Sequence, residues 1–106
     1  MIKLTQVAAK QVQAAAEQGA MQGMALRIAV KTDDTGAFEY GFGFDQATEE
    51  DLQFTSEGID IVVSPAYAEL VRDLVIDYVE IEPGKHHFIF LNPNDPNYVP
   101  PKDMEN

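Results

Sequence analysis

The most informative feature of this 106-residue chain is a residue type that it lacks, because it contains no cysteine. Without thiols the chain cannot form a disulfide, supply a thiolate nucleophile or ligate an iron–sulfur cluster through sulfur atoms of its own. Histidine is scarce as well, with two residues in the whole chain.

Positive charge is also in short supply. Seven Lys and Arg residues stand against 18 Asp and Glu residues, which gives a formal net charge of −11. A surface this acidic repels the phosphates of nucleic acids and the headgroups of anionic lipids. We therefore expect no direct contact with nucleic acid and no membrane association. The same charge is compatible with a basic protein partner.

Long apolar runs are missing too. No stretch approaches the roughly 18 residues that a membrane-spanning helix requires, and glutamines interrupt residues 1–20, where a signal peptide would have its apolar segment. These absences predict a cytoplasmic protein. The chain still has 45% hydrophobic residues, including six Phe and four Tyr, which suffices for the core of one domain.

The first half of the sequence predicts a short strand at residues 2–4, a helix and two strands. Thr5 is a suitable N-cap for a helix that runs to Gly19. Apolar residues alternate with other residues over residues 24–30, as in a half-buried strand. A second alternating run places four aromatic residues on one strand face, and we predict that they belong to the core: Phe38, Tyr40, Phe42 and Phe44.

The second half predicts a hairpin over residues 52–63, with its turn at residues 56–58, and a short helix over residues 65–73 that Ser64 caps. Two further strands follow, joined at Pro83–Gly84. The sum is a mixed α+β domain with six or seven mostly antiparallel strands and two helices.

An ordered set of short segments resembles the A-type iron–sulfur carriers, the IscA/SufA/HesB family. The matching segments include "ALRIAV", "GIDIVV", "LVIDYV" and "FIFLNPN", the last of which ends at Asn94. The resemblance implies a HesB-like, β-sandwich-like domain over residues 1–94. Residues 95–106, which are rich in proline, are predicted to form an irregular and mobile tail.

The family's three cluster-ligating cysteines are missing, and by this register their positions hold Thr35, Val99 and Pro101. Cluster iron requires soft thiolate ligands, which neither a hydroxyl nor an apolar side chain can replace. We therefore expect no cofactor. Relatives often assemble so that cysteines from several chains meet, and without them we expect a monomer or dimer.

Among cysteine-free proteins, the chain resembles a member of the family from the dissimilatory sulfur-oxidation gene cluster of sulfur bacteria. That resemblance implies an accessory or regulatory role in sulfur oxidation or iron–sulfur metabolism, exerted on an unidentified protein partner. The sequence contains no catalytic constellation, so we expect no enzymatic activity and no catalytic residue. The best candidates for contacting a partner are Tyr98 and Val99, in a proline-restricted segment.

An alternative function is a metal-binding module with oxygen and nitrogen ligands. Its candidate ligands are Asp33, Asp34, His86 and His87. Adjacent residues of a strand point to opposite faces, so the two histidines cannot chelate one ion together. A hard cation needs about six oxygen ligands, and an acidic turn is the simpler interpretation of Asp33 and Asp34.

Overall fold

A computed structural model describes residues 2–96 and 98 as two β-sheets, one α-helix and one 3₁₀ turn. One sheet has the strand order β3-β2-β5-β4 and the other the order β1-β6-β7. The elements, in chain order, are β1 (Lys3–Leu4), α1 (Gln6–Gln18), β2 (Ala25–Thr32), β3 (Phe38–Asp45), β4 (Leu52–Ser56), β5 (Ile59–Val63), η1 (Pro65–Tyr67), β6 (Val75–Glu82) and β7 (Lys85–Leu91).

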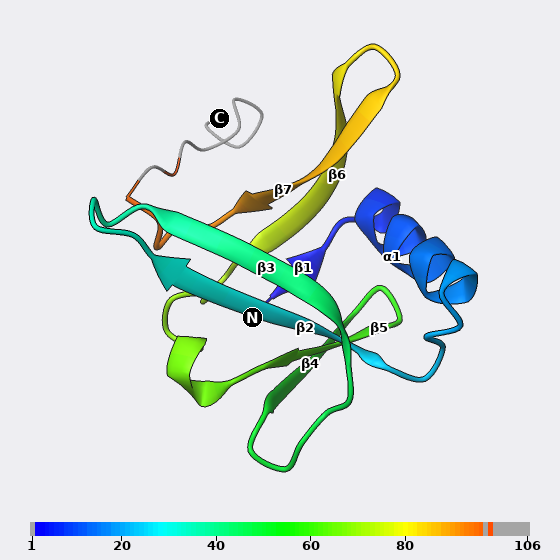
Figure 1. Ribbon diagram of the computed structural model, residues 1–106, viewed down its shortest axis with the longest axis horizontal. Helices are drawn as coiled ribbons and strands as arrows, with labels where there is room; N and C mark the ends of the chain where they lie inside the picture. Colours follow the sequence, from blue (N-terminus) through cyan, green and yellow to red (C-terminus); the bar gives the residue numbers. More distant parts are fainter. Residues whose placement is uncertain (1, 97, 99–106) are drawn as a thin grey trace.

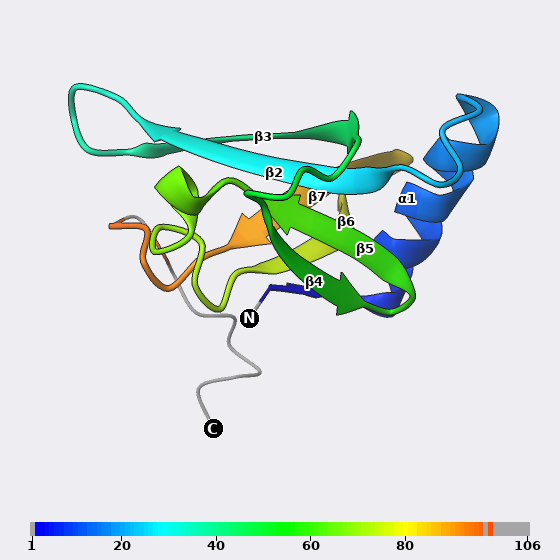
Figure 2. The ribbon, with the colours of Figure 1, turned by 90° about the horizontal axis from the view of Figure 1, so that it is seen from below.

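The two sheets form two layers (Figure 1). Figure 2 shows the long β2–β3 hairpin lying across β6 and β7, with α1 closing one end of the molecule. Three of the five strand pairs are antiparallel, whereas β1–β6 and β2–β5 are parallel. The mixed, mostly antiparallel fold predicted from the sequence is confirmed.

Helix α1 begins where the sequence predicts. The Thr5 side chain accepts a hydrogen bond from the Ala8 N–H at 3.1 Å, which satisfies one of the free donors of the first turn. The Thr5 hydroxyl in turn donates to Asp77 of β6 at 2.7 Å and ties the start of the helix to the sheet. No helix in the described part of the chain is long and apolar enough to cross a membrane.

The end of α1 is a Schellman motif, in which the N–H of Met21 bonds to the carbonyl of Ala16 at 2.8 Å. The N–H of Ala20 also bonds, at 3.4 Å, to the carbonyl of Glu17. Ala20 has a φ of 57°, a left-handed conformation that usually selects glycine. The motif turns the chain back over the last turn of α1 and brings Met21 beside it.

The prediction of a second helix over residues 65–73 is wrong. Only Pro65–Tyr67 are helical, as a single 3₁₀ turn, and residues 68–73 continue as turns. A segment of nine residues is too short to hold a stable helix by itself. Tertiary packing determines the conformation of this segment, because its path buries Val71 and Leu74, which are at most 1% exposed.

Side chains from both sheets and from α1 form one core. The alternation predicted around Leu26, Ile28 and Val30 is confirmed, since none of the three is more than 2% exposed. Burial of this kind contributes about 1.5–3 kcal/mol for each large apolar side chain. The buried cluster consists of Ile2, Leu4, Ala8, Ala9, Val12, Leu26, Ile28, Val30, Ile61, Val63, Val71, Leu74 and Ile76.

The aromatic row of β3 is only partly core. Phe38, Tyr40 and Phe44 are half-buried against the core cluster, but Phe42 is 40% exposed. The reason is that β3 is an edge strand, so its aromatic face meets β7 without being covered further. The Tyr40 and Phe90 rings stack with centroids 4.6 Å apart, and Phe42 meets Phe88 and Phe90 edge-on.

The β4–β5 hairpin turns through two residues with positive φ, Glu57 at 51° and Gly58 at 78°. Two consecutive positive values define a type I′ turn, in which Asn, Asp or Gly is preferred at the first position. Glutamate has no such preference, so Glu57 adopts the left-handed conformation at a cost.

Replacing Glu57 with asparagine is therefore expected to raise the free energy of unfolding by about 0.5–1 kcal/mol. Urea denaturation of the variant and the wild type measures the difference. The matched control is Glu57→Gln, which removes the same charge but keeps a side chain unsuited to positive φ. Equal stabilisation by both substitutions would assign the effect to charge and contradict the conformational explanation.

Candidate functional site

The loop between β2 and β3 contains Thr35, at the first position where the resemblance assigns a cysteine. Asp33 organises this loop, because its Oδ1 accepts hydrogen bonds from the Thr35 N–H at 2.8 Å, the Thr35 hydroxyl at 2.5 Å and the Ala37 N–H at 3.0 Å. These bonds lower the pKa of Asp33, and the bond from the Thr35 hydroxyl contributes most. Gly36 closes the turn with a φ of 85°. Thr35 thus stabilises the conformation of the loop.

The chemistry of the Thr35 side chain does not fit a cluster. Iron in such clusters is held by thiolates, about four for each cluster, whereas a threonine hydroxyl stays protonated near neutral pH. The Thr35 hydroxyl also donates a hydrogen bond to Asp33 within the loop. The loop therefore has the form of a turn and lacks a ligand for cluster iron.

The candidate metal ligands do not come together. Asp33 and Asp34 lie in the turn at one end of the β2–β3 hairpin, whereas His86 and His87 lie next to the turn of the β6–β7 hairpin (Figure 1). The His86 ring stacks on Tyr78 with centroids 5.4 Å apart. Among the described residues, no group of three His, Asp or Glu side chains could hold a metal ion.

The segment that follows β7 is fixed by Asn92, which is buried at 1% exposure. Its side-chain amide donates to the carbonyl of Leu70 at 2.7 Å. Its Oδ1 accepts from the Asn94 backbone N–H and from the Asn94 side-chain amide, both at 2.9 Å. The Asn94 amide also donates to the carbonyl of Arg72 at 2.7 Å. Asn92 and Asn94 therefore fasten the chain to the turns that replace the second predicted helix.

The residues after Asn94 contact β3. The Tyr40 hydroxyl donates to Asp95 at 2.9 Å. The pKa of Tyr40 is raised to about 12, mainly because the side chain is partly buried and secondly because of this bond. Tyr98, a predicted partner-binding residue, is half-buried rather than fully exposed, and its N–H bonds to the carbonyl of Asp95 at 2.9 Å. The other predicted positions, Val99 and Pro101, lie outside the described residues.

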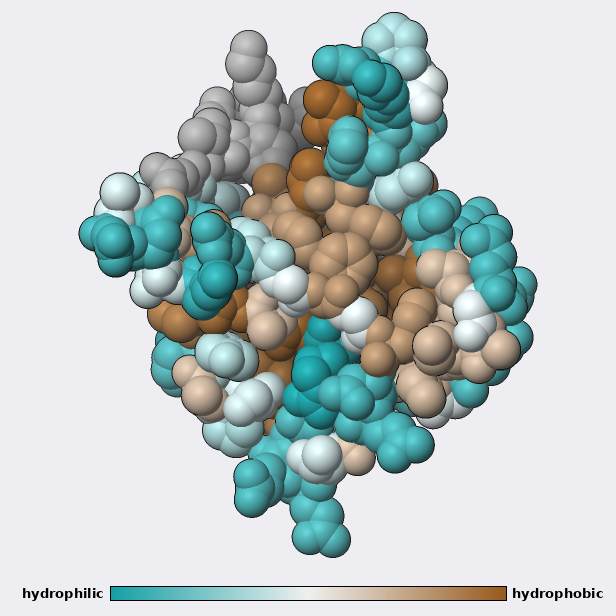
Figure 3. Space-filling model, viewed as in Figure 1, coloured by the Kyte–Doolittle hydropathy of each residue, from teal (hydrophilic) through white to brown (hydrophobic). Residues whose placement is uncertain are grey.

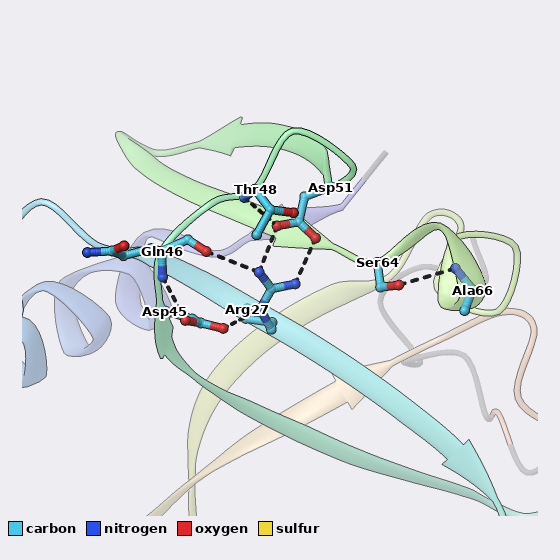
Figure 4. Close-up of polar contacts among 7 residues, drawn as sticks. All are labelled: Arg27, Asp45, Gln46, Thr48, Asp51, Ser64 and Ala66. Carbon is cyan, nitrogen blue, oxygen red and sulfur yellow. Dashed lines mark hydrogen bonds and ion pairs between the residues drawn. The ribbon is translucent and has the colours of Figure 1, made fainter.

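An ion-pair network centred on Arg27 was not predicted (Figure 4). The guanidinium of Arg27 binds both carboxylate oxygens of Asp51, at 2.8 and 2.7 Å, and its Nε binds Asp45 at 2.6 Å. It also donates to the carbonyl of Gln46 at 3.1 Å, while Thr48 donates its N–H to Asp51. The Asp51 side chain is only 4% exposed. Hydrogen bonds from Arg27 hold the pKa of Asp51 well below its usual range and also lower the pKa of Asp45.

The Arg27 network ties three segments of the fold together. It joins β2, the end of β3 and the loop before β4, and all of its described donors are directed at carboxylates or carbonyls of this chain. At the far side of Figure 4, the Ser64 hydroxyl accepts from the Ala66 N–H at 3.4 Å and caps the 3₁₀ turn. In sequence, Arg27 reads as an ordinary polar position of the strand and Asp51 as part of a charged loop. The one clue in the sequence is that an arginine, which can bind a carboxylate through two N–H groups, stands between apolar residues of a predicted strand.

Comparisons with known proteins decide the family. The pattern of the family described as "Iron-sulphur cluster biosynthesis" matches residues 1–97. This chain belongs to the iron–sulphur cluster biosynthesis family. The resemblance to A-type carriers found in the sequence is thereby confirmed.

Two iron–sulfur cluster insertion proteins are 30–32% identical to this chain. The iron–sulfur cluster insertion protein ErpA 2 of Methylococcus capsulatus is 32% identical over 94 residues, which are 88% of this chain and 72% of that protein. ErpA of Yersinia pestis is 30% identical over 94 residues, or 88% of this chain and 82% of that protein.

Solved structures of family members have the same fold. The crystal structure of IscA with the [2Fe-2S] cluster superposes with a TM-score of 0.77 at 31% identity, over 89% of this chain and 86% of that one. The structure of Escherichia coli SufA, at 24% identity, has a TM-score of 0.71 over 88% of this chain and 86% of that one. The family fold is thus retained by a chain without cysteine.

Proposed function

We propose that this protein is a non-enzymatic accessory or regulatory factor of iron–sulfur metabolism that acts through contacts with another protein and carries no cluster. One observation carries the proposal: the family fold is kept, whereas the three ligand positions hold Thr35, Val99 and Pro101. The β2–β3 loop is ordered without a cluster, because Asp33 accepts hydrogen bonds from the Thr35 N–H and hydroxyl.

The process we propose is sulfur oxidation, in the cytoplasm. This step rests on the similarity to a cysteine-free family member from the sulfur-oxidation gene cluster. The net charge of −11 supports a protein target over a nucleic acid or a membrane.

Cross-linking in cells that express the protein natively tests this function. A tagged chain is cross-linked and its attached proteins are identified by mass spectrometry. We expect one recurrent partner from iron–sulfur or sulfur metabolism, and the same partner for an Asp33→Ala, Asp34→Ala variant because these carboxylates are not a required metal site. A chain that cross-links to no other protein would contradict the proposal.

A further inference from the structure

A groove lies between the end of α1 and the β4–β5 turn. It has a volume of about 240 Å³. Pockets for drug-sized ligands usually occupy about 300–1,000 Å³, so this groove fits an anchoring side chain better than a free small molecule. The residues that line it, here called the α1–β5 groove, are Val12, Gln13, Ala16, Glu17, Met21, Gln22, Gly23, Met24, Phe44, Gly58, Ile59 and Asp60.

The α1–β5 groove contains exposed apolar side chains beside polar ones. Met21 is 37% exposed and Met24 is 39% exposed, and they are two of the six large apolar side chains that are exposed in the described part of the chain. Figure 3 shows apolar surface over β3 and toward the loop that follows α1. Methionine side chains are flexible and polarisable, so they adapt to the side chain that is bound.

The edge of the α1–β5 groove is negative. Glu17 lies in the last turn of α1, at the negative end of the helix dipole, and this last turn contains no basic residue. Asp60 lies on the opposite side, in β5, with Glu57 in the adjacent turn. No ion pair to Glu17, Glu57 or Asp60 is formed among the described residues. The charge of this edge is therefore available to a cation.

We propose that the α1–β5 groove binds a segment of a partner protein in which one large apolar side chain stands beside lysine or arginine. The apolar side chain enters between Met21 and Met24, and the cation meets Glu17 or Asp60. A second copy of this chain fits poorly, because each copy has a net charge of −11 and would bring acidic groups against an acidic edge. The proposal rests on the proposed function, since it names the surface through which the protein contacts would be made.

Peptide selection tests the groove directly. A phage-displayed library of random dodecapeptides is selected on the wild-type protein, and the enriched peptides are synthesised and titrated by fluorescence anisotropy. We expect enrichment of Leu, Ile, Phe or Met next to Lys or Arg, and affinity that falls as salt is raised. Enrichment of acidic peptides, or affinity independent of salt, would overturn the proposal.

Two lysine variants locate the binding surface. Met24→Lys is expected to weaken peptide binding about tenfold or more, since it places a charge at the anchor. Leu52→Lys is the matched control, because Leu52 is exposed to the same degree, 41% against 39% for Met24, but lies on β4 outside the groove. Equal loss in both variants, or none in Met24→Lys, would show that the groove is not the site. Thermal unfolding of both variants excludes a folding defect.

The same variants separate this inference from the proposed function. If the wild type cross-links to a partner in cells and Met24→Lys cross-links to it equally, the groove is wrong and the proposed function stands. If no partner is found for the wild type, the proposed function fails. Self-association that Met24→Lys abolishes would assign the groove to a second copy and overturn the proposal.

Discussion

Replacing Asn92 with alanine is expected to lower the free energy of unfolding by about 3 kcal/mol. Asn92 is 1% exposed, and its side chain satisfies the Leu70 carbonyl and the Asn94 N–H at the same time. An unsatisfied polar group costs about 1–3 kcal/mol when it is buried, and alanine would remove the partner of two part-buried groups and leave a small cavity. Urea denaturation, with the change in midpoint read at constant slope, measures the loss.

The control for this prediction is Asn94→Ala. Asn94 is exposed, so water can replace its side-chain bond to the Arg72 carbonyl at 2.7 Å, and we expect a loss of no more than about 1 kcal/mol. If both alanine variants lose the same stability, the buried hydrogen bonds of Asn92 do not fasten the segment after β7 as described here.

Replacing Arg27 with methionine is the second substitution with a large expected effect. Methionine keeps much of the apolar stem of arginine but leaves the Asp51 carboxylate without its two guanidinium bonds, in a position that is 4% exposed. Breaking a fully buried pair costs about 3–5 kcal/mol. Because the Arg27 side chain is 25% exposed, we expect a smaller loss of about 2 kcal/mol.

The dependence of stability on pH provides a second measure of the Arg27 network. The pKa values of Asp51 and Asp45 are lowered in the folded state, chiefly by hydrogen bonds from Arg27. A lowered pKa stabilises the fold above the pKa of the unfolded carboxyl, about 4, and this stabilisation is lost as the pH falls toward the folded pKa. Wild-type stability should therefore decrease between about pH 5 and pH 2.

Arg27→Met should show a shallower decrease over the same pH interval, because the two carboxyls lose the hydrogen bonds from Arg27 that lower their pKa values. Denaturation midpoints measured at a series of pH values compare the two proteins. Lys31→Met is the control, since the Lys31–Glu39 pair at 3.4 Å is exposed on both sides and should change the pH dependence little. Parallel curves for wild type and Arg27→Met would contradict the account of this network.

Local signals in the sequence predict most of the elements and few of the contacts between them. Thr5 begins α1 because capping depends on residues a few positions apart, and the Pro83–Gly84 turn joins β6 to β7 for the same local reason. The segment after Ser64 carries equally good local signals, yet it forms turns, because packing of Val71 and Leu74 decides its path.

The tertiary contacts around Arg27, Asn92 and Tyr40 join residues far apart in the chain. Arg27 meets Asp51 across 24 positions, Asn92 meets Leu70 across 22, and Tyr40 meets Asp95 across 55. No pattern of spacing in one sequence identifies such partners. The sequence did not predict that Phe42 is exposed either. Alternation places an aromatic residue on one face of a strand but does not indicate how fully a neighbouring sheet covers that face.

The loop chemistry around Thr35 shows what the sequence could decide. The absence of cysteine excludes thiolate ligation whatever the fold. The structure adds that the Thr35 hydroxyl is directed to Asp33, so the residue at the position where the resemblance assigns a cysteine stabilises its own loop. This chain therefore has the family fold without a cysteine to ligate a cluster.

Anaerobic reconstitution of the purified protein with iron and sulfide, followed by visible absorption and iron analysis, tests the central claim most directly. A cysteine-bearing family member treated in parallel shows that the conditions allow a cluster to form. We expect the relative to become coloured and this protein to remain colourless, without stoichiometric iron. A stable coloured product with iron at near-stoichiometric occupancy would show that other ligands hold a cluster, and would contradict the claim that this protein acts without one.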